Sequence, residues 1–195
     1  MKNILSLLLL LSAVISTSCD NSNKPKEDSA KNNDTASGPT ANNSEQGNTG
    51  TIDQIVSGYL DLKNALANDS GVEAEKAANE ISEAIAKLNE STLTPDQKKV
   101  YGELKDDIKE HAGHIGKSGS NIAHQREHFD LLSKDMIDLV KATGTSKALY
   151  KDFCPMYNNK KGASWLSEIK EIKNPYFGKE MSGCGEVKEE IKAKG

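Results

Sequence analysis

Four sulfur side chains lie close together near the C-terminal end of this 195-residue sequence. Cys154 and Met156 stand in FCPMY, and Met181 and Cys184 stand in MSGC. Thiolates and thioethers are soft ligands that favour Cu(I) and similar ions over calcium, magnesium or manganese. If the chain folds the two pairs face to face, they form a site for Cu(I) or Ag(I). Zinc is the second choice, because the four-cysteine spacing of a structural zinc site is missing.

The two cysteines of this stretch also have a simpler interpretation. An exported chain with two cysteines left after lipidation most simply joins them in a disulfide. The two methionines would then be ordinary packing residues. The two states can alternate, because an oxidised pair could not bind a metal ion and a reduced pair could.

Histidines are the other possible ligands in this sequence. His124 and His128 are spaced i, i+4 and therefore share one face of a predicted helix. His128 lies beside Phe129 in QREHF, so we expect it to be the histidine that joins the sulfur site. A histidine on a helix face is more often a hydrogen-bonded structural residue than a ligand, and we expect this role for His111 and His114.

Four amphipathic segments precede the sulfur-containing stretch and must position it. Apolar residues recur at helical spacing over residues 51–66, 72–88, 95–115 and 122–143. Thr51 and Gln54 predict a capping box at the start of the first helix, and TPDQ predicts the start of the third. The connections are short, so we expect a mainly α fold, an antiparallel four-helix bundle.

The sequence changes in character after Gly144. ALYKDFCPM, residues 148–156, has the composition of a strand that ends at its proline, and GASWLS, residues 162–167, can return as a second strand. The stretch from 173 to 187 is rich in glycine and proline, which indicates loop. We therefore expect a small irregular C-terminal cap with two short strands, which carries both sulfur pairs.

The N-terminal segment indicates export and lipidation. An apolar run is followed by small residues and then by Cys19, which is the layout of a lipoprotein signal peptide over residues 1–18. Residues 20–50 contain no Val, Ile, Leu, Met or aromatic residue, so we expect residues 19–50 to be a disordered tether. The globular domain would then occupy residues 51–195, anchored in the cell envelope and most simply facing the periplasm.

Charge and motifs exclude several classes of function. The chain has 25 Lys and Arg against 29 Asp and Glu, a formal net charge of −4, and its single arginine is Arg126. This balance is a poor match to a nucleic-acid-binding protein. The sequence contains no G-x-S-x-G elbow, no H-E-x-x-H pair and no glycine-rich phosphate loop, so we do not expect an enzyme.

Several C-terminal motifs resemble those of a known bacterial domain family. The matching stretches are QREHFDLLS (125–133), FCPM (153–156), GASWLS (162–167) and IKNPYFGKEMSGCGEV (172–187). They are similar to an uncharacterised domain that occurs in envelope lipoproteins and as a C-terminal extension of some CusB-type copper and silver efflux adaptors. The resemblance implies a link to heavy-metal handling in the periplasm, and a metal-efflux adaptor as a possible partner.

Two functions therefore follow from the sequence. In the first, a lipid-anchored protein binds copper or silver through Cys154, Met156, Met181, Cys184 and His128, and either sequesters the ion or passes it on. In the second, a disulfide-stapled helical module binds another envelope protein and no metal.

Overall fold

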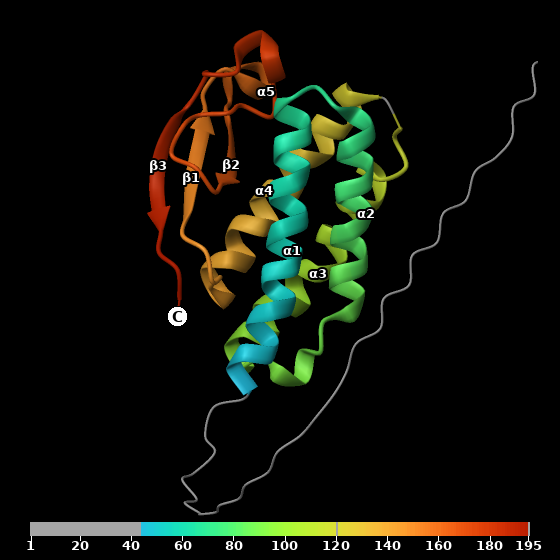
Figure 1. The fold of residues 1–195 in the computed structure, drawn as a ribbon, viewed down its shortest axis with the longest axis vertical. Helices are drawn as coiled ribbons and strands as arrows, with labels where there is room; N and C mark the ends of the chain where they lie inside the picture. The colour runs from blue at the N-terminus through green and yellow to red at the C-terminus, as the bar shows by residue number, and fades with distance from the viewer. Residues whose placement is uncertain (1–43, 120, 195) are drawn as a thin grey trace, which may run out of the picture. The chain divides into compact units, whose positions relative to one another are not determined.

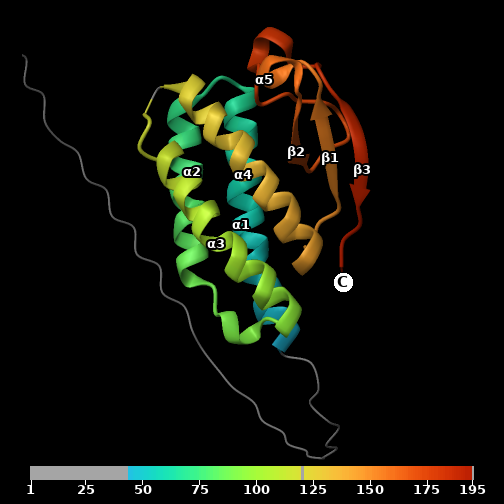
Figure 2. The ribbon, with the colours of Figure 1, turned by 180° about the vertical axis from the view of Figure 1, so that it is seen from behind.

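The computed structural model describes residues 44–119 and 121–194, and these residues are mainly helical with a small antiparallel sheet at the C-terminal end (Figure 1). The long helices are α1 (Ser44–Ala67), α2 (Gly71–Lys87), α3 (Pro95–Ile115) and α4 (Ile122–Thr143), with a short 3₁₀ helix η1 (Glu90–Thr92) before α3. Helix α1 packs against α2 and α4, and α3 packs against α2 and α4 (Figure 2). Within the described residues, no helix is long and apolar enough to cross a membrane.

The helix starts confirm one prediction and correct another. At α3, Thr94 accepts a hydrogen bond from the Gln97 backbone N–H, and the Gln97 side chain accepts one from the Thr94 N–H, so the helix start that TPDQ predicts is confirmed and has a capping box. The predicted capping box at Thr51 is wrong, because α1 begins at Ser44. Extending an existing helix by a few polar residues costs little free energy, so an apolar pattern does not mark its first residue. The signal peptide, Cys19 and the tether up to residue 43 lie outside the described residues.

The hydrophobic core lies between the four long helices and continues under the sheet. Tyr59 stacks on Phe129 with 5.3 Å between ring centroids, and Phe129 in turn contacts Tyr176 of the C-terminal segment. Alanines line the buried face of α2, where they allow close approach to its neighbours; they are Ala74, Ala77, Ala78 and Ala84. The core therefore joins the helices and the C-terminal segment into one packed body.

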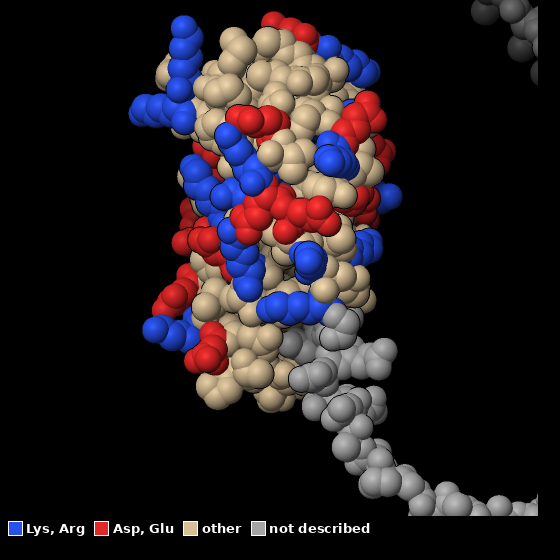
Figure 3. Space-filling view, turned by 90° about the vertical axis from the view of Figure 1, so that its left-hand side faces the viewer, with Lys and Arg blue, Asp and Glu red and all other residues tan. Residues whose placement is uncertain are grey.

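The C-terminal segment contains three strands rather than the two that we predicted. They are β1 (Leu149–Cys154), β2 (Ala163–Ser167) and β3 (Glu186–Ile191), arranged antiparallel in the order β2-β1-β3. Strand β3, EVKEEI, escaped prediction because most of its side chains are charged and exposed, as is common on the edge of a sheet. Lysines alternate with acidic residues on the face of the molecule shown in Figure 3.

Short segments connect the strands. Helix α5 (Tyr157–Lys160) is in effect a tight reversal, because Asn158 and Asn159 have φ values of 50° and 55°, as expected for the asparagine turn between β1 and β2. The 3₁₀ helix η2 (Gly178–Met181) begins at the glycine of the Asn-Pro-Tyr-Phe-Gly stretch and precedes β3.

Hydrogen bonds from the single arginine of the sequence connect this C-terminal segment to the helices. The Arg126 guanidinium donates hydrogen bonds to the backbone oxygens of Pro175 (2.8 Å) and Leu66 (2.9 Å) and to the Asp69 carboxylate (2.6 Å). The bond from Arg126 holds the pKa of the Asp69 carboxyl below its usual range. One side chain of α4 therefore joins the end of α1 to the loop before η2.

Candidate metal centre

The structure brings the two cysteines of the C-terminal segment together. Cys154 ends β1 and is fully buried, whereas Cys184 lies just before β3 and is partly exposed. Their Sγ atoms are 2.9 Å apart, although 30 positions separate them in the sequence. Both are free thiols. The contact with Cys154 and burial together raise the pKa of the Cys184 thiol to about 11.

The two methionines of the predicted sulfur site lie on the same segment. The Met156 side chain is half exposed, with 50% of its surface accessible, and Met181 is partly buried at the end of η2. The Cys184 backbone N–H donates to the Met181 carbonyl oxygen over 3.0 Å, so this pair shares one tight turn. A metal site at these four sulfur atoms stays a prediction.

All four histidines of the chain meet on the facing sides of α3 and α4. Helix α3 contributes His111 and His114, and α4 contributes His124 and His128. The rings of His114 and His128 stack with centroids 4.3 Å apart, and the His124 ring stands edge-on to His128 at 4.6 Å. Thus His128, which we expected beside the sulfur atoms, lies among the other three histidines.

The ring nitrogens of this histidine cluster are close enough to share hydrogen bonds and ligands. Nδ1 of His111 lies 3.3 Å from Nδ1 of His128, so the N–H of one ring donates to the unprotonated nitrogen of the other. His114, His124 and His128 each present a ligand atom, and these atoms lie within 4.8 Å of one another. The cluster therefore offers three nitrogens to one ion. His111 is hydrogen-bonded to one of these three histidines, His128.

Two carboxylates flank the histidine cluster. The Glu127 carboxylate lies 3.3 Å from Nδ1 of His124, and the Glu110 carboxylate lies 3.8 Å from Nε2 of His114. A carboxylate that accepts the N–H of one ring nitrogen leaves the other nitrogen free to bind a metal ion. Burial, helped by the charges of the other histidines, lowers the pKa of His128 and favours the neutral ring that metals require.

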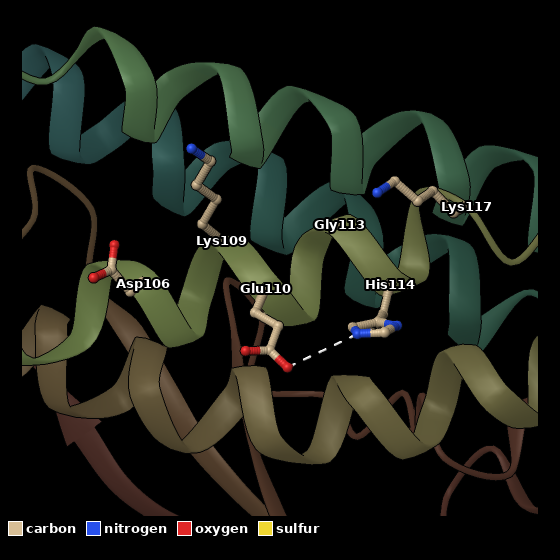
Figure 4. A pocket seen from close by; sticks show the side chains of 6 residues that line it. All are labelled: Asp106, Lys109, Glu110, Gly113, His114 and Lys117. Atoms are coloured by element: carbon tan, nitrogen blue, oxygen red, sulfur yellow. Dashed lines mark ion pairs between the residues drawn. The ribbon is translucent and has the colours of Figure 1, made fainter.

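A shallow hollow of about 350 Å³ runs along α3 beside the histidine cluster. Glu110 and His114 lie on the side of α3 that faces α4, whereas Lys109 and Lys117 extend to the opposite side (Figure 4). About half of the His114 side chain and 42% of the His124 side chain are exposed. Solvent and small ions therefore reach the cluster from outside.

The cluster fits a metal ion after a modest rotation of its rings. Two nitrogens bound to one ion lie at most about 4.2 Å apart, because each bond is about 2.1 Å long. The longest of the present separations, up to 4.8 Å, must therefore shorten by at least roughly 0.6 Å. The stacked ring of His114 must also turn, and its exposed position leaves it free to do so.

The spacing of the histidines contains a signal that sequence reasoning missed. In an antiparallel helical hairpin, residues equally distant from the turn face one another. His114 and His124 are each five positions from Gly119, and His111 and His128 are eight and nine positions from it. Treating the two helices separately, as we did, hides this symmetry. Helix α3 ends at Gly116, whose Cα lies so close to α2 that a Cβ there would meet the Asn79 side chain.

Comparison with known proteins gives one match. Residues 55–148 match the model of a family described as "Protein of unknown function (DUF3347)". The matched region runs from α1 to the residue before β1, so it contains the histidine cluster and stops short of Cys154 and Cys184. No curated protein and no solved structure matches this chain.

Proposed function

We propose that this chain is a lipid-anchored metal-binding protein of the cell envelope, which holds a copper ion at the histidine cluster for sequestration or transfer. One observation carries the proposal: the fold gathers all four histidines of the chain from two helices into one partly exposed cluster. A shared metal ion would explain why four histidines from two helices converge at one place.

Ligand chemistry favours copper among the ions that imidazoles bind. Imidazole suits zinc, copper, iron and nickel, and the affinity of nitrogen sites for divalent ions rises to a maximum at Cu²⁺. The flanking carboxylates of Glu110 and Glu127 add negative charge beside the ion and orient two of the rings. The exposed position of the site suits exchange of the ion with a partner more than permanent burial.

The arrangement of the helices supports this site. We interpret α1–α4 as an antiparallel four-helix bundle, an architecture in which side chains from facing helices build metal sites. Cys19 and the polar segment after it would hold this domain away from a membrane, facing the periplasm. The resemblance to extensions of copper and silver efflux adaptors makes such an adaptor the expected recipient or donor of the ion.

The four sulfur atoms are a second candidate site for the same function. The meeting of Cys154 and Cys184 favours it, because two thiolates at one place are strong ligands for Cu(I) or Ag(I). Met156 and Met181 would complete the coordination. This site and the histidine cluster differ in the oxidation state they prefer, so copper titrations can separate them.

A titration of the mature chain with Cu²⁺, purified without a histidine tag, tests the proposal. Cys154→Ala/Cys184→Ala serves as the background, since it keeps every histidine and prevents thiol oxidation by Cu²⁺. We expect one bound ion whose electron paramagnetic resonance spectrum shows coupling to imidazole nitrogens. Adding His114→Ala/His128→Ala should weaken binding at least about 100-fold, which corresponds to about 2.8 kcal/mol.

The same titration can contradict the proposal. Equal Cu²⁺ affinity with and without the two histidine substitutions, in variants with unchanged circular dichroism, would show that the cluster is not the site. If neither Cu²⁺ nor Cu(I) binds the parent chain more tightly than free imidazole does, the remaining function is the disulfide-stapled module that binds another envelope protein.

A further inference from the structure

The segment that carries Cys184 is held rigidly in place by a buried asparagine. The Asn174 side chain is fully buried, and its amide N–H donates to the Cys184 carbonyl oxygen over 2.6 Å. Its Oδ1 accepts the backbone N–H groups of Tyr176 (2.8 Å) and Phe177 (3.1 Å). Its own backbone N–H donates to the Ser182 carbonyl oxygen over 2.8 Å. One residue therefore fixes the backbone on which Cys184 is mounted.

A glycine sets the distance between this segment and β1. Gly185 has a φ of 145°, and a Cβ there would lie 2.8 Å from the Trp165 ring and 3.1 Å from the Phe153 carbonyl oxygen. Only glycine allows so close an approach. Cys154, on the other side, is the last residue of the central strand and pairs with Ala163. Both thiols therefore project from backbone that has little freedom to move apart.

From this geometry we infer that Cys154 and Cys184 are an oxidation site, where an envelope oxidant of the disulfide class joins them and ties residues 178–187 to β1. The inference rests on the export of the chain and not on the histidine cluster. A disulfide is uncharged, so it can form beside the fully buried Cys154 without burying an ion. A metal thiolate there would carry charge into the core, and the half-exposed Met156 does little to enclose it.

The chemical step is a thiol–disulfide exchange in two stages. The partly exposed Cys184 loses its proton, and its thiolate attacks the oxidant's disulfide, so that one sulfur of the oxidant leaves as a thiolate. The Cys154 thiolate then attacks the mixed disulfide and displaces the second sulfur of the oxidant. Two S–H bonds are lost and one S–S bond forms, while two electrons reduce the oxidant and two protons are released.

Equilibration of the reduced full chain carrying Cys19→Ser, which leaves Cys154 and Cys184 as its two thiols, with glutathione buffers tests this inference. Free thiols are alkylated after quenching, and intact mass counts them. We expect the pair to be fully oxidised in a buffer whose redox potential matches that of the periplasm. The intact mass should then be lower than that of the reduced chain by two hydrogen atoms, with no glutathione attached. Cys154→Ser should instead trap the mixed disulfide of Cys184 with glutathione, because the second thiolate is missing.

Substitution of the buried Asn174 tests whether the fold positions Cys184 for disulfide formation with Cys154. Asn174→Ala should shift the dithiol–disulfide equilibrium at least about tenfold toward the dithiol, because Cys184 is then less well held. Asn89→Ala, at the start of η1, is the matched control and should leave the equilibrium unchanged. Circular dichroism confirms that each variant folds.

Two results would overturn the inference. One is alkylation of both thiols in the folded parent after equilibration with excess oxidised glutathione. The other is protection of both thiols by stoichiometric Cu(I) in that same buffer, which would assign the pair to the sulfur metal site. Neither result would bear on the proposed copper site at the histidine cluster, because the titration that tests that site uses the variant without these two cysteines.

Discussion

Asp152 makes the stability of this fold depend on pH. It lies in the middle of the central strand β1 with no exposed surface, and neither carboxylate oxygen accepts a hydrogen bond from the described part of the chain. Burial raises the pKa of its carboxyl to about 7, although the positive charge of Lys63 opposes this rise. The Lys63 ammonium is itself buried and lies 2.8 Å from the Glu168 carboxylate. Hydrogen bonds from Asn64 and Lys63 lower the pKa of Glu168 despite its burial, so Glu168 remains the ionised partner.

The sign and size of the effect follow from the two pKa values of Asp152. Between its ordinary pKa of 3.8 and the folded value of about 7, the folded chain binds more protons than the unfolded chain. The contribution of this group is therefore most favourable below 3.8, declines as the pH rises, and is constant above about 7. A shift of roughly three units corresponds to about 4 kcal/mol of unfolding free energy over this whole window.

Asp152→Asn removes the titration and keeps the size of the side chain. We expect urea unfolding to show that the free energy of unfolding of the variant, relative to the parent, rises by about 3 kcal/mol from about pH 5 to about pH 8. Any constant cost of burying the amide cancels in this comparison. Asp61→Asn, on the exposed face of α1, is the matched control for the loss of one carboxylate. A flat difference for Asp152→Asn would refute the reasoning.

Three further predictions concern a core hydrogen bond, a strained glycine and the anchor. Tyr59→Phe removes the hydroxyl that lies 2.8 Å from the buried Ser133 hydroxyl, and it should lower the unfolding free energy by about 1–2 kcal/mol in urea denaturation. Gly178→Ala, at a φ of 56° and with its Cβ against the Asp69 carboxylate, should lower the melting temperature and cost more than the roughly 1–2 kcal/mol of the backbone conformation alone. Cys19→Ser should move the protein from the membrane to the soluble fraction of fractionated cells, and unchanged fractionation with a cleaved signal would contradict lipidation.

Much of the helical part of the fold could be predicted from the sequence, because its signals are local. The Thr94–Gln97 capping box and the four apolar patterns each lie within a few turns of one helix. The edge strand β3 could not be predicted, since its charged residues carry no apolar pattern and its pairing with β1 is formed by residues more than 30 positions away. The start of α1 at Ser44 likewise has no apolar signal.

The two candidate sites also differ in how far they could be predicted from the sequence. The meeting of Cys154 with Cys184 was expected from residue type and compartment, without any knowledge of the sheet. The gathering of the histidines depends on how α3 and α4 face one another, so judging each histidine on its own helix assigned structural roles to His111 and His114 and left His124 out of the predicted site. Only the way in which α3 and α4 pair along their lengths reveals the cluster.

Arg126 also affects how the protein unfolds. Its guanidinium joins the end of α1 at Leu66, the turn after it at Asp69 and the loop before η2 at Pro175, so opening the C-terminal segment would remove the Pro175 acceptor from a partly buried cation. The sheet and the helices should therefore open as one cooperative unit, with the hydrogen-bonded backbone amides of residues 174–184 exchanging with deuterium as slowly as those of α4. A protease that attacks the exposed edge strand would consequently have to wait for global unfolding.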